Sequence, residues 1–335
     1  MSSGLATTYL GLPLSGPLIA SASPLTGRID SLLALEAAGA SAVVLPSLFE
    51  EDVVAEESEL AERLEVGDDF AEFSGSPLPE IEQPELGSGR HRRLVQKAKA
   101  QLKIPVIASL NATRPGSWQR YAAELADAGA DALELNLYSV AADPLKSAAE
   151  VELDHLAAIE AVKIAVDIPL AVKLSPFYSA MSKFASLAVD AGADGLVLFN
   201  RFYAPDLDLD RLKLFAKADL SQPDDQRIAL RWIGILRSQL PEVALACTSG
   251  VHSGEEIIKA LLVGANVACT TSAVLRRGPE AITQMLAEAD AWLADHDYLG
   301  VDQLRGSMSV GSVGDASAYE RAQYQAVLLS GRHVG

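Results

Sequence analysis

The chain has little cysteine and no long apolar run. Cys247 and Cys269 are the only cysteines among 335 residues, too few for a disulfide framework or, on their own, for an iron–sulfur cluster. No stretch of about 18 apolar residues occurs, and the first residues lack a basic segment followed by an apolar one. These absences predict a cytoplasmic protein without membrane spans, in which both thiols are buried and inert.

Positive charge is also scarce. The sequence has 27 basic and 45 acidic side chains, giving a net charge of −18. Such a balance argues against nucleic acid and against anionic membrane surfaces as partners. The histidines form no metal-ligand pair, so we predict no metal site. Four of them are predicted to lie at the surface: His91, His155, His296 and His333.

A repeated pattern indicates the fold. In seven segments a helical pattern ends and an apolar strand begins: 37–45, 102–110, 127–135, 166–174, 190–198, 240–248 and 263–271. The joints use glycine and proline alternately, since glycine closes a helix in the left-handed conformation and proline cannot continue one. With Leu18–Ser21 there are eight strands, whose continuous apolar character is typical of burial on both faces.

Eight such strands alternating with helices predict a TIM (β/α)8 barrel. An open doubly wound sheet is the alternative, but no glycine-rich dinucleotide turn follows the first strand. Residues 49–90 and 201–225 predict extended loops after the second and sixth strands. We expect residues 1–295 to form the barrel, and residues 296–335 to form an extension packed on the barrel or on a partner subunit.

Polar residues stand at the carboxyl ends of the predicted strands, where such barrels carry their active sites. They are Ser21–Ser23, Ser47, Ser109, Asn111, Asn136, Lys173, Asn200, Thr248 and Thr270–Ser272. Lys173 is the sharpest candidate, because an ammonium group among aliphatic side chains requires an anion or several acceptors. The alternative is a structural ion pair with a neighbouring strand.

The loops after the last two strands, 248–256 and 270–279, are rich in small residues and precede helices. Backbone N–H groups at such positions suit a phosphate. Helix capping alone would explain the composition of one loop, but two adjacent loops favour an anion site. Arg276 or Arg277 could assist there, or both could be solvated.

Seven segments in order resemble the dihydroorotate dehydrogenase family: GPLIASASPLT (16–26), PVIASLN (105–111), ELNLYS (134–139), AVKLSPF (171–177), LVLFN (196–200), TSGVHSGEE (248–256) and VGANVACTTSAVLRRGP (263–279). LFNRFY (198–203) and GSMS (306–309) are more similar to a bacterial branch of dihydroorotate dehydrogenase-like proteins. The resemblance implies a TIM barrel with FMN at the carboxyl ends of its strands.

By position, the resemblance places the flavin ring and ribityl chain near Ser21, Ala22, Asn136 and Lys173. Asn200 matches an asparagine that contacts substrate or flavin, and Ser249, Gly250, Thr271 and Ser272 match the phosphate-binding positions. With the strand-end residues added, the predicted FMN site comprises Ser21, Ala22, Ser47, Asn111, Asn136, Lys173, Asn200, Thr248, Ser249, Gly250, Thr271 and Ser272.

The chain also departs from the family pattern. Class 1 enzymes carry a lysine where this chain has Pro46, and nothing in 49–90 corresponds to the loop that helps them grip orotate. Their catalytic cysteine falls at Ser139, a position where class 2 enzymes use serine. The resemblance therefore implies Ser139 and Lys173 as catalytic residues. A serine base must pass its proton on, and Tyr138 is its nearest candidate partner in sequence.

The combined expectation is an FMN-dependent oxidoreductase that oxidises dihydroorotate in pyrimidine biosynthesis. The alternatives are a flavoenzyme for another cyclic amide or enoate, a flavin-free barrel acting on a phosphorylated metabolite, and a non-catalytic binding subunit. The expected partners are a small-molecule substrate, a second copy of the chain in a homodimer, and a redox protein.

Overall fold

Eight parallel strands close into a barrel in the computed structural model, which describes residues 4–49, 87–111, 118–202, 205–216, 219–321 and 329. The ring runs β3 (Leu18–Ala20), β4 (Val43–Phe49), β5 (Val106–Asn111), β6 (Ala132–Asn136), β7 (Leu170–Leu174), β8 (Gly195–Leu198), β11 (Ala244–Cys247) and β12 (Val267–Thr270), which pairs back to β3. The predicted barrel and its eight strands are confirmed.

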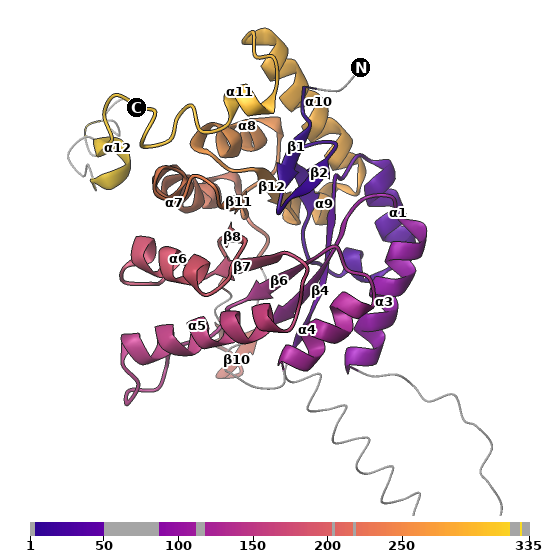
Figure 1. Cartoon of the computed structure of the whole chain (residues 1–335), viewed down its shortest axis with the longest axis vertical. Coiled ribbons are helices and arrows are strands. Elements are labelled where there is room, and N and C mark those ends of the chain that lie inside the picture. The colour runs from indigo at the N-terminus through magenta and orange to yellow at the C-terminus, as the bar shows by residue number, and fades with distance from the viewer. Residues whose placement is uncertain are drawn as a thin grey trace, which may run out of the picture.

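Helices surround the strands (Figure 1). They are α1 (Ile29–Ala37), α3 (Gly87–Gln101), α4 (Trp118–Asp127), α5 (Ala148–Ile164), α6 (Met181–Asp190), α7 (Gln226–Gln239), α8 (Gly254–Val263), α9 (Ser272–Arg277) and α10 (Glu280–Asp295). No helix in the described part of the chain is both long and apolar enough to cross a membrane.

The helix-to-strand joints have the predicted chemistry. All four joint glycines have φ between +101° and +118°: Gly39, Gly129, Gly192 and Gly264. Pro105 and Pro169 directly precede β5 and β7, and their carbonyls accept from the neighbouring strands' Val43 and Leu133. Each joint thus ends a helix and places the next strand in register.

Aliphatic side chains, many of them alanines, line the inside of the barrel, and an N-terminal hairpin enters it from the amino-terminal ends of the strands. Strands β1 (Thr7–Tyr9) and β2 (Leu12–Leu14) are joined by Leu10 and Gly11, both at positive φ. Tyr9 and Leu10 are buried in the same cluster as five interior alanines: Ala42, Ala132, Ala171, Ala244 and Ala246. The hairpin covers the amino-terminal end of the barrel, opposite the carboxyl ends of the strands that carry the predicted site residues.

A register shift in β4 sets the side chains at the mouth of the barrel. Val44 pairs with Ile107, but Ser47 rather than Pro46 pairs with Ser109. Proline cannot donate a ladder hydrogen bond, so it is tolerated at such a bulge. The extra residue brings the Ser47 hydroxyl next to Ser109.

Two of the predicted extensions are partly described. Within 201–225, β9 (Pro205–Asp208) and β10 (Lys213–Ala216) form a hairpin. In the C-terminal segment, α11 (Val301–Leu304) and α12 (Ser317–Glu320) occur, and Gly306 and Met308 donate backbone hydrogen bonds to α8. Residues 50–86 lie outside the described residues, and with them most of the extended loop predicted after the second strand.

Candidate active site

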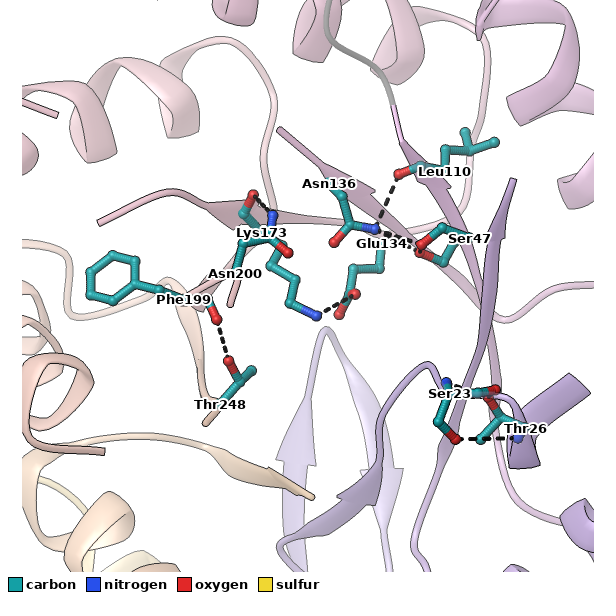
Figure 2. Close-up of polar contacts among 11 residues, drawn as sticks. Ser23, Thr26, Ser47, Leu110, Glu134, Asn136, Lys173, Phe199, Asn200 and Thr248 are labelled. Carbon is teal, nitrogen blue, oxygen red and sulfur yellow. Dashed lines mark hydrogen bonds and ion pairs between the residues drawn. The ribbon is translucent and has the colours of Figure 1, made fainter. Parts of the chain in front are cut away.

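Asn136 is the centre of a hydrogen-bonded group at the mouth of the barrel (Figure 2). Its Nδ2 donates to Ser109 Oγ at 2.8 Å, Ser47 Oγ at 3.0 Å and the Leu110 carbonyl at 3.2 Å. The two serine hydroxyls are 2.8 Å apart. Two other strands, β4 and β5, therefore fix the amide of β6, and its Oδ1 remains available as an acceptor at the mouth.

Lys173 pairs with Glu134 inside the barrel. The Nζ–Oε1 distance is 3.2 Å, and the exposed fractions of the two side chains are 13% and 4%. The pair joins β7 to the neighbouring β6, which is the structural alternative expected for this lysine. It leaves the other two ammonium hydrogens free, so a role toward a ligand and the ion pair are compatible.

Asn200 and Thr248 hold the next part of the rim. Asn200 Nδ2 lies 3.5 Å from the Lys173 carbonyl, and the Asn200 backbone N–H extends the ladder to Leu174. Thr248 Oγ1 donates to the Phe199 carbonyl at 2.5 Å. These bonds tie the ends of β7, β8 and β11 together (Figure 2).

Two buried polar atoms of the predicted flavin site lack a nitrogen or oxygen partner. Asn111 Oδ1 makes no hydrogen bond within the described part of the chain, and Ser21 Oγ makes none to nitrogen or oxygen there; its one polar contact is with the weakly bonding Cys269 thiol, whose pKa it lowers. Ala22 follows Ser21 and packs against the barrel-interior cluster. Unsatisfied buried groups are rare in proteins, and an unfilled ligand site is one explanation.

The two predicted phosphate loops are shaped by backbone conformation. Ser249 and Gly250 have φ of 66° and 74° in succession. A Cβ on Gly250 would lie 2.6 Å from the backbone N of Gln226 and 2.8 Å from the Pro223 carbonyl. Glycine is therefore required for this close approach.

Ser272 follows Thr271 and is the first residue of α9. Its hydroxyl accepts hydrogen bonds from Ser221. Ser221 N and Oγ donate to Ser272 Oγ at 3.0 and 2.9 Å, and Ser221 Oγ is 3.1 Å from His252 Nε2. Burial, followed by the charge of Arg276, lowers the pKa of His252. The segment before α7 is thus fastened to both predicted phosphate loops.

The two candidate arginines bind loop carbonyls. Arg276 donates to Leu220 and Arg277 to His252. Both side chains are exposed. They hold the loops in place, and a role as direct anion ligands stays a prediction.

Ser139 lies three residues beyond β6 and bonds a histidine. Its Oγ is 3.1 Å from His155 Nε2, and His155 Nδ1 is 2.8 Å from the Tyr178 hydroxyl. His155 is 5% exposed, so its prediction as a surface residue was wrong. Buried polar groups require partners, and here the imidazole has one on each nitrogen.

Comparison with known proteins identifies the family. The family model for dihydroorotate dehydrogenase matches residues 88–293, more than half of the chain. The chain belongs to the dihydroorotate dehydrogenase family.

Individual members of the dihydroorotate dehydrogenase family are moderately similar to this chain in sequence. The NAD(+)-type B catalytic subunit of Methanothermobacter thermautotrophicus is 26% identical over 213 residues, covering 61% of this chain and 69% of that protein. The corresponding subunit of Methanosarcina acetivorans is 27% identical over 302 residues, covering 88% and 93%. The putative fumarate-type A enzyme of Aeropyrum pernix is 27% identical over 222 residues, covering 64% and 71%.

The two cysteines lie in the barrel wall of this family member and are buried, as predicted. Burial raises the pKa of each thiol to about 12, and for Cys269 the charge of Glu134 adds to the effect. Among the residues that the structure describes, no group of three His, Cys, Asp or Glu side chains is arranged to hold a metal ion.

Glu134 and His155 were not predicted as site residues from the sequence, although the strand and helix periods indicate that both side chains face inward. Glu134 is two residues before Asn136 in the same strand, so both side chains point to the same face. His155 stands three, four and seven residues before Ala158, Ile159 and Val162 on the buried face of α5. The helical period therefore marks this histidine as an inward-facing residue.

Proposed function

We propose that this protein is an FMN-dependent oxidoreductase that oxidises dihydroorotate, or a close cyclic relative, at a CH–CH bond. Membership of the dihydroorotate dehydrogenase family supports the reaction class. The observation that carries the cofactor assignment is the pair of buried atoms without a nitrogen or oxygen partner among the described residues, Ser21 Oγ and Asn111 Oδ1, at the mouth of the barrel. Both belong to the set predicted to bind the flavin.

The donor set fits a flavin mononucleotide. Asn111, Asn136 and Lys173 offer amide and ammonium groups suited to the carbonyl and nitrogen edge of the ring and to the ribityl chain. The loops at Ser249–Gly250 and Thr271–Ser272 offer backbone N–H groups and hydroxyls for a phosphate. FMN would supply the two-electron acceptor for hydride, and the protein would orient the substrate and remove a proton.

Ser139 is the proposed proton acceptor for the substrate. We expect Ser139→Ala to retain the cofactor and slow the reductive half-reaction by about 10²-fold or more, the scale of general-base catalysis. To identify the cofactor, it is released from the protein by heat and its molecular mass is measured. Recovery of FAD, or failure of the protein to bind FMN on reconstitution, would exclude the assignment.

The substrate is tested separately by anaerobic mixing with dihydroorotate and following the flavin absorbance. Bleaching supports the proposed reaction. A protein that binds FMN but is reduced only by another cyclic amide or enoate would retain the cofactor assignment and change the substrate. A barrel that binds no flavin would favour action on a phosphorylated metabolite or a binding role.

The hydroxyl of Ser21 gives a sharper test of the cofactor site. Ser21→Ala removes only the weak contact with the Cys269 thiol from the flavin-free protein, so we expect its melting temperature to be unchanged within a few degrees. FMN affinity should fall roughly fivefold, since one net hydrogen bond contributes about 1 kcal/mol.

Ser307→Ala is the matched control for Ser21→Ala. Ser307 Oγ is also buried without a partner in the described residues, but it lies in the C-terminal segment that packs against α8. Its removal should leave the FMN affinity unchanged. Equal effects of the two substitutions on affinity would contradict a flavin contact at Ser21.

We further propose a homodimer that passes electrons to a redox partner. Several relatives are named catalytic subunits, which implies another kind of subunit in those proteins and supports the redox partner rather than the homodimer. Light scattering of the purified chain measures the mass directly. A monomer at micromolar concentration would exclude the homodimer.

A further inference from the structure

The hydroxyl of Ser139, the imidazole of His155 and the phenol of Tyr178 form a continuous hydrogen-bonded chain. Ser139 is half-buried three residues beyond the carboxyl end of β6, and His155 contacts it from α5. Tyr178 comes from the loop after β7. Its ring stacks on Phe184 of α6 at 3.8 Å, and His155 meets both rings edge to face.

We propose that His155 is the positioning residue for Ser139: it orients the serine hydroxyl and holds the proton that Ser139 gives up. The assignment rests on the proposed function of Ser139 as the group that deprotonates substrate. The geometry of Oγ–Nε2 at 3.1 Å and Nδ1–OH at 2.8 Å carries it.

The step balances as a proton transfer coupled to hydride loss. A substrate C–H bond breaks and its proton moves to Ser139 Oγ, while the serine's own proton moves to Nε2 of His155. The electron pair of that C–H bond forms the new C=C bond, and bound FMN would accept the hydride that the adjacent carbon releases. The imidazolium keeps its Nδ1–H bonded to the Tyr178 oxygen.

This role requires one tautomer of the neutral ring. Nε2 must be unprotonated to accept from Ser139, so Nδ1–H must donate to the Tyr178 oxygen. Burial raises the pKa of Tyr178, so the phenol stays protonated, and its hydroxyl can accept from Nδ1–H or donate to a bare Nδ1. The proposed role requires the first of these arrangements, in which the Tyr178 oxygen accepts from Nδ1–H and Nε2 is left open.

The surroundings keep the imidazole neutral, so one of its ring nitrogens carries a lone pair that can accept from Ser139. Burial lowers the pKa of His155, and the two charged groups that face it act in opposite directions. Asp154 of its own helix raises that pKa and Lys146 of the preceding loop lowers it, and these two form an ion pair with each other. From the other elements packed against the ring come Ser139, the Tyr178 phenol and the apolar Phe184.

A thiol placed at Ser139 reports this proton transfer without flavin or substrate. In S139C, a neighbouring histidine should take the thiol proton and form a thiolate–imidazolium pair. We expect the rate of iodoacetamide alkylation against pH to rise with an apparent pKa at least one unit below the reference value of about 8.5. The two native thiols, whose pKa values are raised to about 12, should not react with iodoacetamide in the folded protein.

In S139C/H155Q the apparent pKa should return to about 8.5 or higher. S139C/H296Q is the control, because His296 is exposed and stacks on Trp292 far along the chain, and its profile should match that of S139C. Coincident profiles for S139C and S139C/H155Q would overturn the proposal. The apparent pKa of S139C/Y178F should lie between those of S139C and S139C/H155Q. The substitution removes the tyrosine's hydrogen bond to Nδ1 but keeps the imidazole that accepts the proton.

A second measurement avoids substitution at the buried histidine. Nitrogen NMR of the unsubstituted protein, labelled at histidine, distinguishes a protonated from an unprotonated ring nitrogen, and Y178F identifies the His155 signals by their shift. We expect a neutral ring at pH 7 with the proton on Nδ1. A neutral ring protonated on Nε2 would overturn the proposal. Neither readout involves dihydroorotate, so a wrong substrate would show only as a failure of flavin reduction.

Discussion

At the scale of single residues, Lys173 is held by an ion pair and predicted to hold a ligand. Removing one partner of a buried pair leaves the other charge unpaired in an apolar interior, which is strongly destabilising. Glu134 is 4% exposed and faces the Lys173 ammonium at 3.2 Å. Stability alone therefore cannot reveal whether the ammonium also contacts the flavin.

We expect Lys173→Ala to lower the free energy of unfolding by about 3–5 kcal/mol, because it strands the Glu134 carboxylate. The double substitution Lys173→Met with Glu134→Gln removes both charges and should recover most of that loss. If Lys173 also binds FMN, the double variant should fold well and still bind FMN weakly. Urea unfolding and a flavin titration separate the two effects, and full FMN affinity in the double variant would limit Lys173 to the ion pair.

At the scale of single elements, the phosphate loop after β11 depends on one glycine. Gly250 follows Ser249, also at positive φ, and its Cα faces the backbone of the segment before α7 at a distance that excludes a side chain. The loop is thus positioned by backbone packing, and its small residues are a structural requirement as well as a chemical one.

Gly250→Ala should destabilise the protein by about 2 kcal/mol or more, since an L-residue in the left-handed region costs about 1–2 kcal/mol before any clash. The displaced loop should also lose FMN affinity. Gly314→Ala is the control, because Gly314 has open space around its Cβ position and no positive φ. Thermal melts and FMN titrations of both variants provide the comparison. An unaltered FMN affinity in a folded Gly250→Ala protein would count against a phosphate at this loop.

At the scale of the whole molecule, the barrel could be predicted because local signals repeat. Each glycine or proline joint can be recognised from a segment of about ten residues. Continuous apolar strands then leave few alternatives to a closed parallel sheet. The rim could be predicted for the same reason, since Asn136 and Lys173 end adjacent strands. The Lys173–Glu134 pair and the Ser139–His155–Tyr178 chain depend on contacts between elements 16 to 39 residues apart. Sequence position alone does not specify which polar groups meet.

The filled interior also gives the molecule a predicted weakness at high pH. Tyr9 of the N-terminal hairpin, Cys247 and Cys269 are all buried, and burial raises the pKa of each, to about 12 for the thiols and well above 10 for the phenol. Because these pKa values are higher in the folded state than in the unfolded chain, the neutral groups stabilise the fold fully below about pH 8.5. That contribution is lost as the pH rises through about 12, by up to about 1.4 kcal/mol per pH unit for each group.

We therefore expect the urea midpoint, measured under reducing conditions, to fall steadily between pH 8.5 and pH 10.5. Cys247→Ala with Cys269→Ala should start lower at pH 7, because it leaves small cavities. Its midpoint should then decline less steeply, because the unfolded variant has no thiols to ionise. In the unsubstituted protein, both thiols should resist alkylation until the chain unfolds. Parallel midpoint curves for the two proteins, or rapid alkylation of the folded chain at pH 8, would show that the thiols are not held neutral in the barrel.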